Sequence, residues 1–376
     1  MDIGTVDSRP GEVSRGYVEA TRLPTGGPER FPVIVAEGNR EGPTLWVTAA
    51  IHGDEVTSLA AAQDFSDRLD PTELAGRVVC LPVLNPAGLR RNRRTSYYHG
   101  DDPNRYFPAA DAGSARPPRV QELVDGRLFG LVADSADALV SLHSSWAGSA
   151  SYAIRPRVPY GAADDSAETD GTDNTDEPAG TDRPGRTRAE AEEIADRLAD
   201  LTAAFGLPAV NQFDGDRVER QGLHRSLAEA AVREAGVPAF TPELGGRYVV
   251  EEEARRLGVE GLLNVLRAME MVDEPVRTDQ RVEPPVEPPL KRAIHPYTDT
   301  PGVVRYRVDA GDVLAEGDPV ADVLTPHGDR KTTVRTDREG YVLSRHEGVA
   351  VYENDPLLDL AVPDDDPLVV SAEATE

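Results

Sequence analysis

The stretch TLWVTAAIHGDE, residues 44–55, decides the fold of this chain. Residues 44–51 form a mostly apolar run, as in a strand that is buried on both faces, and HGDE follows where the run ends. Gly53 then marks a turn, and residues 56–69 carry apolar side chains at helical spacing. The stretch therefore predicts a strand, a turn and a helix.

The same alternation recurs along the first 272 residues. RVVCLPVL, residues 77–84, predicts a second buried strand, and ALVSL, residues 138–142, predicts a short third one. Strands that alternate with helices are typical of an α/β fold, with a mainly parallel sheet that helices cover on both faces. The sequence also predicts helices at 120–133, about 189–205, 226–235 and 251–272, and a short strand in PAFTPELGG, residues 238–246.

Changes in composition divide the chain. Residues 162–188 are mostly Asp, Thr, Gly, Glu and Pro, too polar to offset their ordering entropy, and predict a disordered insertion in a first domain over 1–272. Residues 273–290 are rich in proline and acid, as in a linker. Residues 291–362 hold short β segments broken by glycine, which predict a small all-β domain, and 363–376 are expected to form an acidic tail. Two half-motifs, AGDVLAEGDPVADV and EGVAVYENDPLLDL, indicate a duplicated barrel-sandwich fold like the lipoyl and biotinyl carrier domains.

Acidic residues outnumber basic ones by 67 to 40, and the formal net charge is −27. Lysine occurs only at Lys291 and Lys331. An acidic protein repels phosphates, so nucleic acid is not an expected partner. The acids are spread along the chain, which indicates a halophilic protein adapted to concentrated salt; an acidic face for a basic partner would concentrate the charge locally.

No apolar run approaches the roughly 18 residues that span a bilayer, so no membrane partner is expected. The N-terminus, MDIGTVDSRPGEVSRG, lacks the basic patch and apolar core of a signal peptide, and we expect a cytoplasmic protein. Cys80 is the sole cysteine, which excludes cysteine-based metal sites, so any metal must use histidines and carboxylates. The sequence leaves the oligomeric state open.

His52 and Glu55 lie three residues apart at the expected carboxyl end of a strand, where open α/β sheets bind ligands. His143 follows the short strand at 138–142 and would project at the same edge of the sheet. Two histidines and one glutamate leave an open fourth position, as in catalytic zinc sites of the carboxypeptidase type. The alternative to a metal site is that His52 is an ordinary turn residue and His143 a buried core histidine. Asp54 and Glu55 would then complement the charge of a helix N-terminus.

Glu243, in TPELGG, also follows a short apolar stretch. A carboxylate beside a metal could take a proton from the attacking water and pass it to the leaving amine. The alternative is one more solvated acid in an acid-rich protein.

The loop LNPAGLRRNRRTSYYHGDDPNRYFP, residues 84–108, concentrates positive charge in an otherwise acidic chain. Arginine binds carboxylates in a bidentate manner, so the loop predicts an anionic substrate. A surface salt-bridge network is the competing explanation, favoured for Arg90 and Arg91. The arginines and asparagines of the loop considered for this role are Asn85, Arg90, Arg91, Asn92, Arg93, Arg94 and Arg105.

The ordered set HGDE, NPAGLRRNRR, DPNRYFP, SLH and TPELGG resembles the succinylglutamate desuccinylase/aspartoacylase family, which is related to the zinc carboxypeptidases. The resemblance covers roughly residues 33–272 without the acidic insertion. It implies that His52, Glu55 and His143 hold one zinc ion per chain and that Glu243 is the general acid and base.

The resemblance further implies that Arg94, nine residues after the asparagine of NPAG, polarises the scissile carbonyl and steadies the oxyanion. Asn104 and Arg105 match the family's pair that grips a substrate carboxylate. Two departures are DPNR at 102–105, where the family usually has Asp-Leu-Asn-Arg, and Leu142, where an aspartate often precedes the zinc-binding histidine. The second departure affects how that ligand is oriented. In the family, a C-terminal β domain packs over the active-site mouth and restricts substrate size.

The expected function is therefore that of a zinc-dependent amidohydrolase, a deacylase that cleaves the amide bond of an N-acyl amino acid or a similar small anionic substrate; esters are accessible to the same chemistry. A metallocarboxypeptidase acting on peptides is the alternative in the same class, favoured by a longer, open groove. A non-catalytic carrier or binding protein is the alternative in another class, with Lys331 as the residue that could be modified, although HGDRKTT lacks the flanking pattern of such carriers. Cobalt or manganese could occupy the same ligands.

Overall fold

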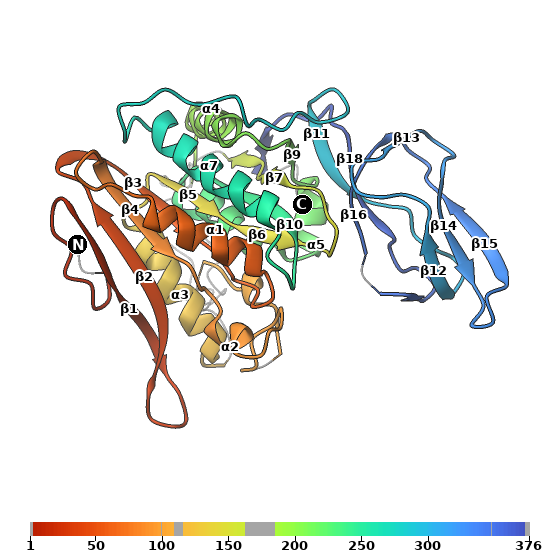
Figure 1. Ribbon diagram of the computed structural model, residues 1–376, viewed down its shortest axis with the longest axis horizontal. Coiled ribbons are helices and arrows are strands. Elements are labelled where there is room, and N and C mark those ends of the chain that lie inside the picture. The colour runs from red at the N-terminus through yellow and green to blue at the C-terminus, as the bar shows by residue number, and fades with distance from the viewer. Residues whose placement is uncertain (1–2, 99, 109–115, 162–184, 347, 373–376) are drawn as a thin grey trace, which may run out of the picture.

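The computed structural model describes residues 3–98, 100–108, 116–161, 185–346 and 348–372. A large mixed sheet with packed helices forms the main body, and a smaller β domain stands beside it (Figure 1). The strands of the main body are β1 (Glu12–Arg22), β2 (Pro28–Glu37), β3 (Arg40–Thr48), β4 (Ala75–Leu81), β5 (Ala138–Ser141), β6 (His143–Ser145), β7 (Tyr152–Arg155), β8 (Val158–Tyr160), β9 (Ala209–Asn211) and β10 (Ala239–Gly246).

The helices all belong to the main body, within the described residues. Helices α1 and α7 lie side by side across the sheet, and α4 packs on α7 (Figure 1). Helix α3 packs on β1 and α6, away from this group. The helices are α1 (Val56–Asp67), α2 (Pro86–Leu89), α3 (Val120–Ala133), α4 (Arg188–Phe205), α5 (Gly215–Arg220), α6 (Leu227–Ala235) and α7 (Glu252–Ala268), with short 3-10 helices η1 (Pro103–Arg105) and η2 (Leu223–Arg225).

The centre of the sheet is parallel, in the order β4-β3-β5-β10, and β1, β2 and β7 add antiparallel strands around it. Leu45, Trp46 and Val47 of β3 are all at most 1% exposed, as is the neighbouring pair Leu139 and Val140 of β5. Successive side chains of a strand point to opposite faces, so both faces of the central strands are covered. The predicted α/β class with a mainly parallel, helix-covered central sheet is confirmed, and antiparallel strands extend this sheet on both sides.

Residues 44–69 form the expected strand, turn and helix. The strand is β3, the turn is residues 49–55 and the helix is α1. The turn depends on Gly53, because a Cβ there would lie 2.1 Å from the backbone carbon of Gly88. The sequence reading missed β1 and β2, which form the antiparallel edge of the sheet.

The smaller domain consists of two four-stranded sheets whose side chains share one core. One sheet has the order β15-β14-β12-β17, and the other, β11-β18-β16-β13, continues the main sheet through the pairing of Lys291 with Asn211. The predicted all-β segment is therefore present, and its first strand is joined to the main body. Its strands are β11 (Leu290–Ile294), β12 (Gly302–Tyr306), β13 (Val313–Leu314), β14 (Pro319–Leu324), β15 (Arg330–Arg335), β16 (Gly340–Arg345), β17 (Ala350–Val351) and β18 (Leu358–Pro363).

The segment expected to be an acidic tail returns to the main body. Asp364 is buried and accepts two hydrogen bonds of 3.0 Å from Arg157 and one of 2.6 Å from Asn211. Strand β19 (Val369–Ser371) then pairs in parallel with β8. Composition alone predicts that Asp364 is exposed to solvent. In the structure this acid is buried beside the positive charge of Arg157, which keeps it paired there.

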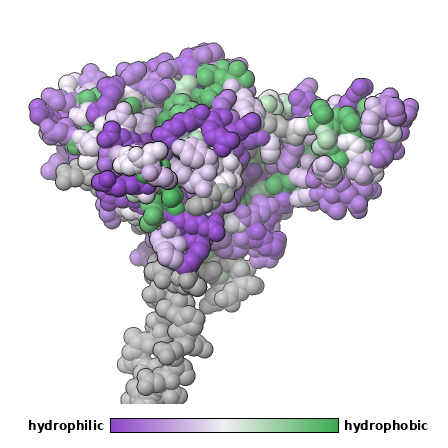
Figure 2. All heavy atoms as spheres, turned by 90° about the horizontal axis from the view of Figure 1, so that it is seen from below, coloured by the Kyte–Doolittle hydropathy of each residue, from purple (hydrophilic) through white to green (hydrophobic). Residues whose placement is uncertain are grey.

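Most of the predicted insertion, residues 162–184, lies outside the described residues, and its end at 188 already belongs to α4, which Thr187 caps. Hydrophilic side chains cover most of the face shown in Figure 2, on the main body and on the smaller domain. Among the described helices, none combines the length and the apolar composition needed to cross a membrane.

Candidate metal centre and active site

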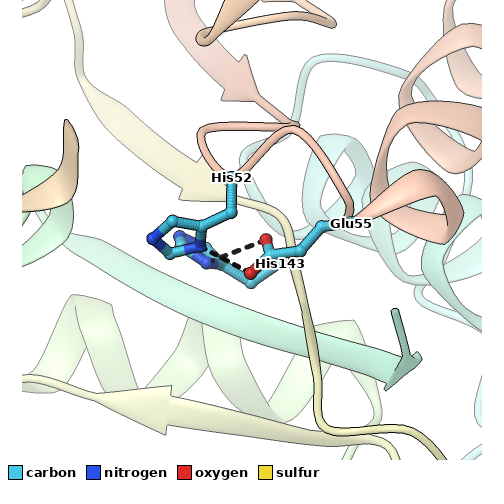
Figure 3. Close-up of side chains that lie close together, drawn as sticks. All are labelled: His52, Glu55 and His143. Carbon is cyan, nitrogen blue, oxygen red and sulfur yellow. Dashed lines mark hydrogen bonds and ion pairs between the residues drawn. The ribbon is translucent and has the colours of Figure 1, made fainter. Parts of the chain in front are cut away.

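Three buried side chains converge at the carboxyl ends of the central strands (Figure 3). His52 Nδ1 lies 2.5 Å from Glu55 Oε1, and His143 Nδ1 lies 3.1 Å from Glu55 Oε2. One ligand atom from each residue lies within 4.8 Å of the other two. The three residues that the sequence selected as metal ligands are therefore brought together.

The sheet register explains this meeting. Strands β3 and β5 run in parallel with Thr48 opposite Ser141, so His52 and His143 follow neighbouring strand ends. Glu55 immediately precedes α1, but its side chain makes no capping hydrogen bond to the helix. Its carboxylate points instead toward the two imidazoles, as the close-up shows (Figure 3). This geometry disfavours the alternative in which Glu55 serves only the helix N-terminus.

The electrostatics of Glu55 fit a cation. Burial alone would raise the pKa of Glu55, but the charges of His52 and His143 hold that pKa well below its usual range. Glu55 Oε2 is buried, and the polar side-chain atom that faces it is His143 Nδ1. Two imidazole nitrogens and an ionised carboxylate are the donors that zinc and similar first-row metals take. The donor set therefore fits the metal that the family resemblance implies.

Asp102 links this cluster to the arginine-rich loop and was not selected from the sequence. Its Oδ1 lies 3.1 Å from His52 Nε2, and its Oδ2 accepts a hydrogen bond of 3.0 Å from Arg94. Burial alone would raise the pKa of Asp102, but His52, Arg94 and Arg105 lower it far below the usual range. A carboxylate on the second ring nitrogen orients a metal-binding histidine and leaves Nδ1 for the metal. Asp102 begins η1 as its cap, and this local signal in DPNR could have indicated a fixed acid.

Arg94 points into the same site. Its Nη1 lies 3.2 Å from His52 Nδ1 and 3.6 Å from Glu55 Oε1. Asn85 places this arginine, because its side chain accepts a hydrogen bond from the Gly88 amide and donates one to the Arg94 carbonyl. Asn85 of the NPAG motif thus fixes the start of the loop, nine residues before Arg94.

Arg90 serves another purpose. It donates hydrogen bonds of 2.7 and 3.0 Å to both carboxylate oxygens of Glu29, a fully buried residue of β2. Tyr98 also donates to this carboxylate. The salt-bridge explanation therefore describes Arg90, while Arg94 belongs to the metal centre.

Glu243 lies on β10 directly opposite His143 of β6, in the parallel register of these two strands. The residue is half-buried, and its Oε2 is buried and has no hydrogen-bond partner among the described residues. Burial raises the pKa of Glu243, against the lowering effects of His143 and Arg292. An unsatisfied carboxylate beside the candidate ligands is suited to exchange a proton with a water or a leaving group.

Asn104 and Arg105 both line the cavity that holds the metal cluster. Asn104 Oδ1 accepts a hydrogen bond of 2.8 Å from the backbone amide of Leu227, which ties η1 to the start of α6. Arg105 has no carboxylate closer than Asp102, 3.8 Å away, among the described residues. Its guanidinium therefore retains donors for an anion.

The cavity has a volume of about 280 Å³ and is lined by both domains. The metal cluster, Glu243, Arg94 and Arg105 line it from the main body. The smaller domain contributes four residues that the sequence did not indicate: Arg292, Ile294, His346 and Asp359. His346 stacks on Trp146 of the main body, with ring centroids 4.9 Å apart.

Comparisons with known proteins agree with this geometry. Residues 41–164 match the family model described as succinylglutamate desuccinylase/aspartoacylase catalytic domain. This segment is therefore similar to the catalytic domain of that family. The match spans the segment that carries His52, Glu55, Arg94, Asn104, Arg105 and His143, and it confirms the resemblance seen in the sequence.

Similar proteins cover almost the whole chain. A relative from Halomonas elongata, named N-alpha-acetyl-L-2,4-diaminobutyric acid deacetylase, is 25% identical over 366 residues, which are 95% of this chain and 94% of the relative. A succinylglutamate desuccinylase/aspartoacylase structure from Rhodobacter sphaeroides has a TM-score of 0.71 at 21% identity and covers 95% of this chain and 96% of its own. The product-bound structure of the ectoine utilization protein EutE (DoeB) from Ruegeria pomeroyi has a TM-score of 0.72 at 20% identity, with 96% and 100% covered. The two structures are similar to this chain in overall fold.

Proposed function

We propose that this chain is a zinc-dependent hydrolase that removes the acyl group from an N-acyl amino acid or a similar small carboxylate-bearing amide. The observation that carries the proposal is the convergence of His52, Glu55 and His143 in one cavity with Glu243. The name of the Halomonas elongata relative, a deacetylase of an N-acetylated amino acid, supports the reaction class.

One zinc ion held by His52, Glu55 and His143 would act as a Lewis acid that polarises the substrate carbonyl and acidifies water. Glu243 faces the same cavity, where its carboxylate accepts the proton of the attacking water and later delivers it to the departing amine. Asp102 keeps the His52 ring oriented through Nε2. Water adds to the amide carbonyl and the C–N bond then breaks, while Glu243 carries the proton from the water to the amine. No acyl-enzyme intermediate forms.

Arg94 provides a fixed positive charge beside the metal cluster, where negative charge develops on the carbonyl oxygen. Arg105 and Asn104 hold the carboxylate of the substrate, which sets the distance between that group and the scissile bond. An enzyme with this arrangement acts on small anionic amides, and on esters of the same shape.

The size of the cavity separates this function from peptide hydrolysis. A volume of about 280 Å³, lined in part by the smaller domain, suits a single acylated amino acid better than an extended peptide. A carrier role for the lipoyl-like domain would use Lys331, whose ammonium donates a hydrogen bond of 2.5 Å to the Pro301 carbonyl at the surface. The intact mass of the purified chain, with no adduct on Lys331, would exclude that role.

Amine release from a panel of N-acyl amino acids tests the proposal. We expect hydrolysis of at least one N-acetyl amino acid, loss of this activity on chelation, and its return when about one equivalent of Zn²⁺ per chain is added. Retained hydrolysis after complete metal removal would contradict the proposed mechanism. Faster hydrolysis of peptides than of N-acyl amino acids would favour the carboxypeptidase alternative.

A further inference from the structure

Arg292 brings a charge from the smaller domain into the active-site cavity. It lies on β11, the strand that joins the two domains, and its side chain is 16% exposed. It lines the same cavity as His52, Glu55 and Glu243. The sequence did not select it, because LKRAI at 290–294 looks like an ordinary strand segment.

An aromatic ring and an amide oxygen hold the Arg292 guanidinium in place, and its nearest described carboxylate is at a longer distance. Its Cζ stands 4.8 Å from the ring centroid of Phe213, and its Nη1 lies 3.4 Å from Gln212 Oε1. The carboxylate of Asp359 is 3.9 Å away. Nε is buried and has no hydrogen-bond acceptor among the described residues.

Arg157, a fully buried arginine of the same protein, shows what close pairing looks like. Arg157 donates to both oxygens of Asp364 at 3.0 Å, and the side chains of both residues are at most 4% exposed. Buried charges normally have such a partner, because an unpaired charge is expensive to remove from water. Among the described residues, the carboxylate that pairs with Arg292 is that of Asp359, at the longer distance of 3.9 Å, which leaves guanidinium donors available to an anionic ligand.

Arg105 lines the same cavity as Arg292. Its nearest described carboxylate oxygen is 3.8 Å away. Burial lowers the pKa of Arg105, and the charges of Arg94 and Arg292 lower it further, so the guanidiniums lie within electrostatic reach of one another. Two guanidiniums in one cavity repel each other unless an anion lies between them. A carboxylate is the anion whose geometry two guanidinium groups match.

We propose that Arg292 and Arg105 together bind one carboxylate of the substrate, one arginine from each domain. This inference rests on the proposed function and adds to it a residue and a specificity. The smaller domain then contributes directly to substrate binding, beyond narrowing the entrance. The preferred substrates are N-acyl amino acids with a free carboxylate, and the corresponding carboxamides bind weakly.

A pair of substrates tests the inference: the best N-acetyl amino acid of the panel and its carboxamide, which differ only in the charged group. For Arg292→Gln we expect KM for the free acid to rise by about 10- to 100-fold, the range for a hydrogen bond to a charged group, with kcat within about threefold. The kcat/KM for the carboxamide stays unchanged. Arg292→Lys keeps the charge but loses the planar fork, so its KM for the acid lies between those of the wild type and Arg292→Gln.

Binding gives a second readout that does not need turnover. Calorimetric titration of the free acid into Glu243→Gln, alone and combined with Arg292→Gln, should show a weaker Kd by the same factor in the double variant. Arg307→Gln is the matched control, because Arg307 is an arginine of the same domain that pairs with Asp322 at the surface. Its KM for the acid should equal that of the wild type.

The inference is overturned if Arg292→Gln lowers kcat/KM equally for acid and carboxamide, since that is the result of a purely structural role. If Arg292→Gln does not fold, Arg292→Lys decides by the same comparison of the two substrates. If the wild type hydrolyses neither substrate, the proposed function fails, and the titration still shows whether Arg292 binds the carboxylate.

Discussion

The two sides of the active-site cavity arise in different ways. On one side, His52, Glu55, His143 and Glu243 extend from the ends of neighbouring central strands or from the turns that follow them. On the other side, Arg292 and its neighbours come from a second domain that continues the sheet through β11. In the proposed mechanism, the first side holds the groups for the reaction, and the second shapes the space for the substrate. We therefore expect substitutions on the strand-end side to lower kcat and those on the domain side to raise KM.

Glu243→Gln should have the largest effect on turnover among the variants that keep the metal ligands. The substitution keeps the size of the side chain but removes proton transfer, so kcat should fall by about 10²- to 10⁴-fold. Metal content and the Kd for the free acid should remain close to the wild-type values. Steady-state kinetics and metal analysis of the same preparation measure this, and a kcat above one tenth of the wild-type value would remove Glu243 from its assigned role.

Arg94→Gln should come next. Removal of a charge that faces the developing oxyanion should lower kcat by about 10²- to 10³-fold. Because Arg94 also contacts Asp102, metal content must be measured on the same sample. A change confined to KM would instead assign Arg94 to the substrate carboxylate. It would contradict the expectation that substitutions on the side of the metal cluster lower kcat.

Arg90→Gln is the control within the same loop and should have the smallest effect on activity, with kcat within about threefold of the wild type. Its effect should fall on stability, because Glu29 would lose its partner. Burial alone would raise the pKa of Glu29, but Arg90 and Tyr98 lower it. We expect the free energy of unfolding to fall by about 1–2 kcal/mol at pH 7.

The pH dependence of that loss has a definite sign. A carboxylate whose folded-state pKa lies below its unfolded value stabilises the fold above the ordinary pKa of about 4.5, and this contribution is lost as the pH falls through the folded-state pKa. The difference in unfolding free energy between wild type and Arg90→Gln should therefore be full at pH 7 and shrink in acid. Denaturant titrations at pH 7 and pH 4 measure it. A difference that is constant with pH would show that the ion pair is not its cause.

The same division between the two sides explains what the sequence could predict. His52, Glu55, His143 and Glu243 were accessible because each follows an apolar run, and the carboxyl ends of neighbouring parallel strands meet at one edge of a sheet. Arg94 and Arg105 were accessible only through the resemblance, since the loop alone offered several arginines. The pairing of Arg90 with Glu29 needed the position of β2, which the sequence reading did not predict.

Arg292 and Asp364 were out of reach for a different reason. Arg292 lies in an ordinary strand segment and Asp364 in an acidic one. Arg292 is half-buried and Asp364 is buried only because β11, β18 and the chain after them pack on β9 and Arg157. Contacts between distant segments of the sequence decide such burial. Local composition does not reveal such contacts, so the residues of the smaller domain that line the cavity could not be predicted from the sequence.

Metal content of purified wild type and His143→Ala, measured beside amine release from the best N-acetyl amino acid, tests the central claim most directly. We expect about one zinc per chain in the wild type, with both the zinc and the activity lost in the variant while the unfolding temperature shows a folded protein. A wild type without bound metal, with turnover unchanged in His143→Ala, would contradict the metal centre and the hydrolase built on it.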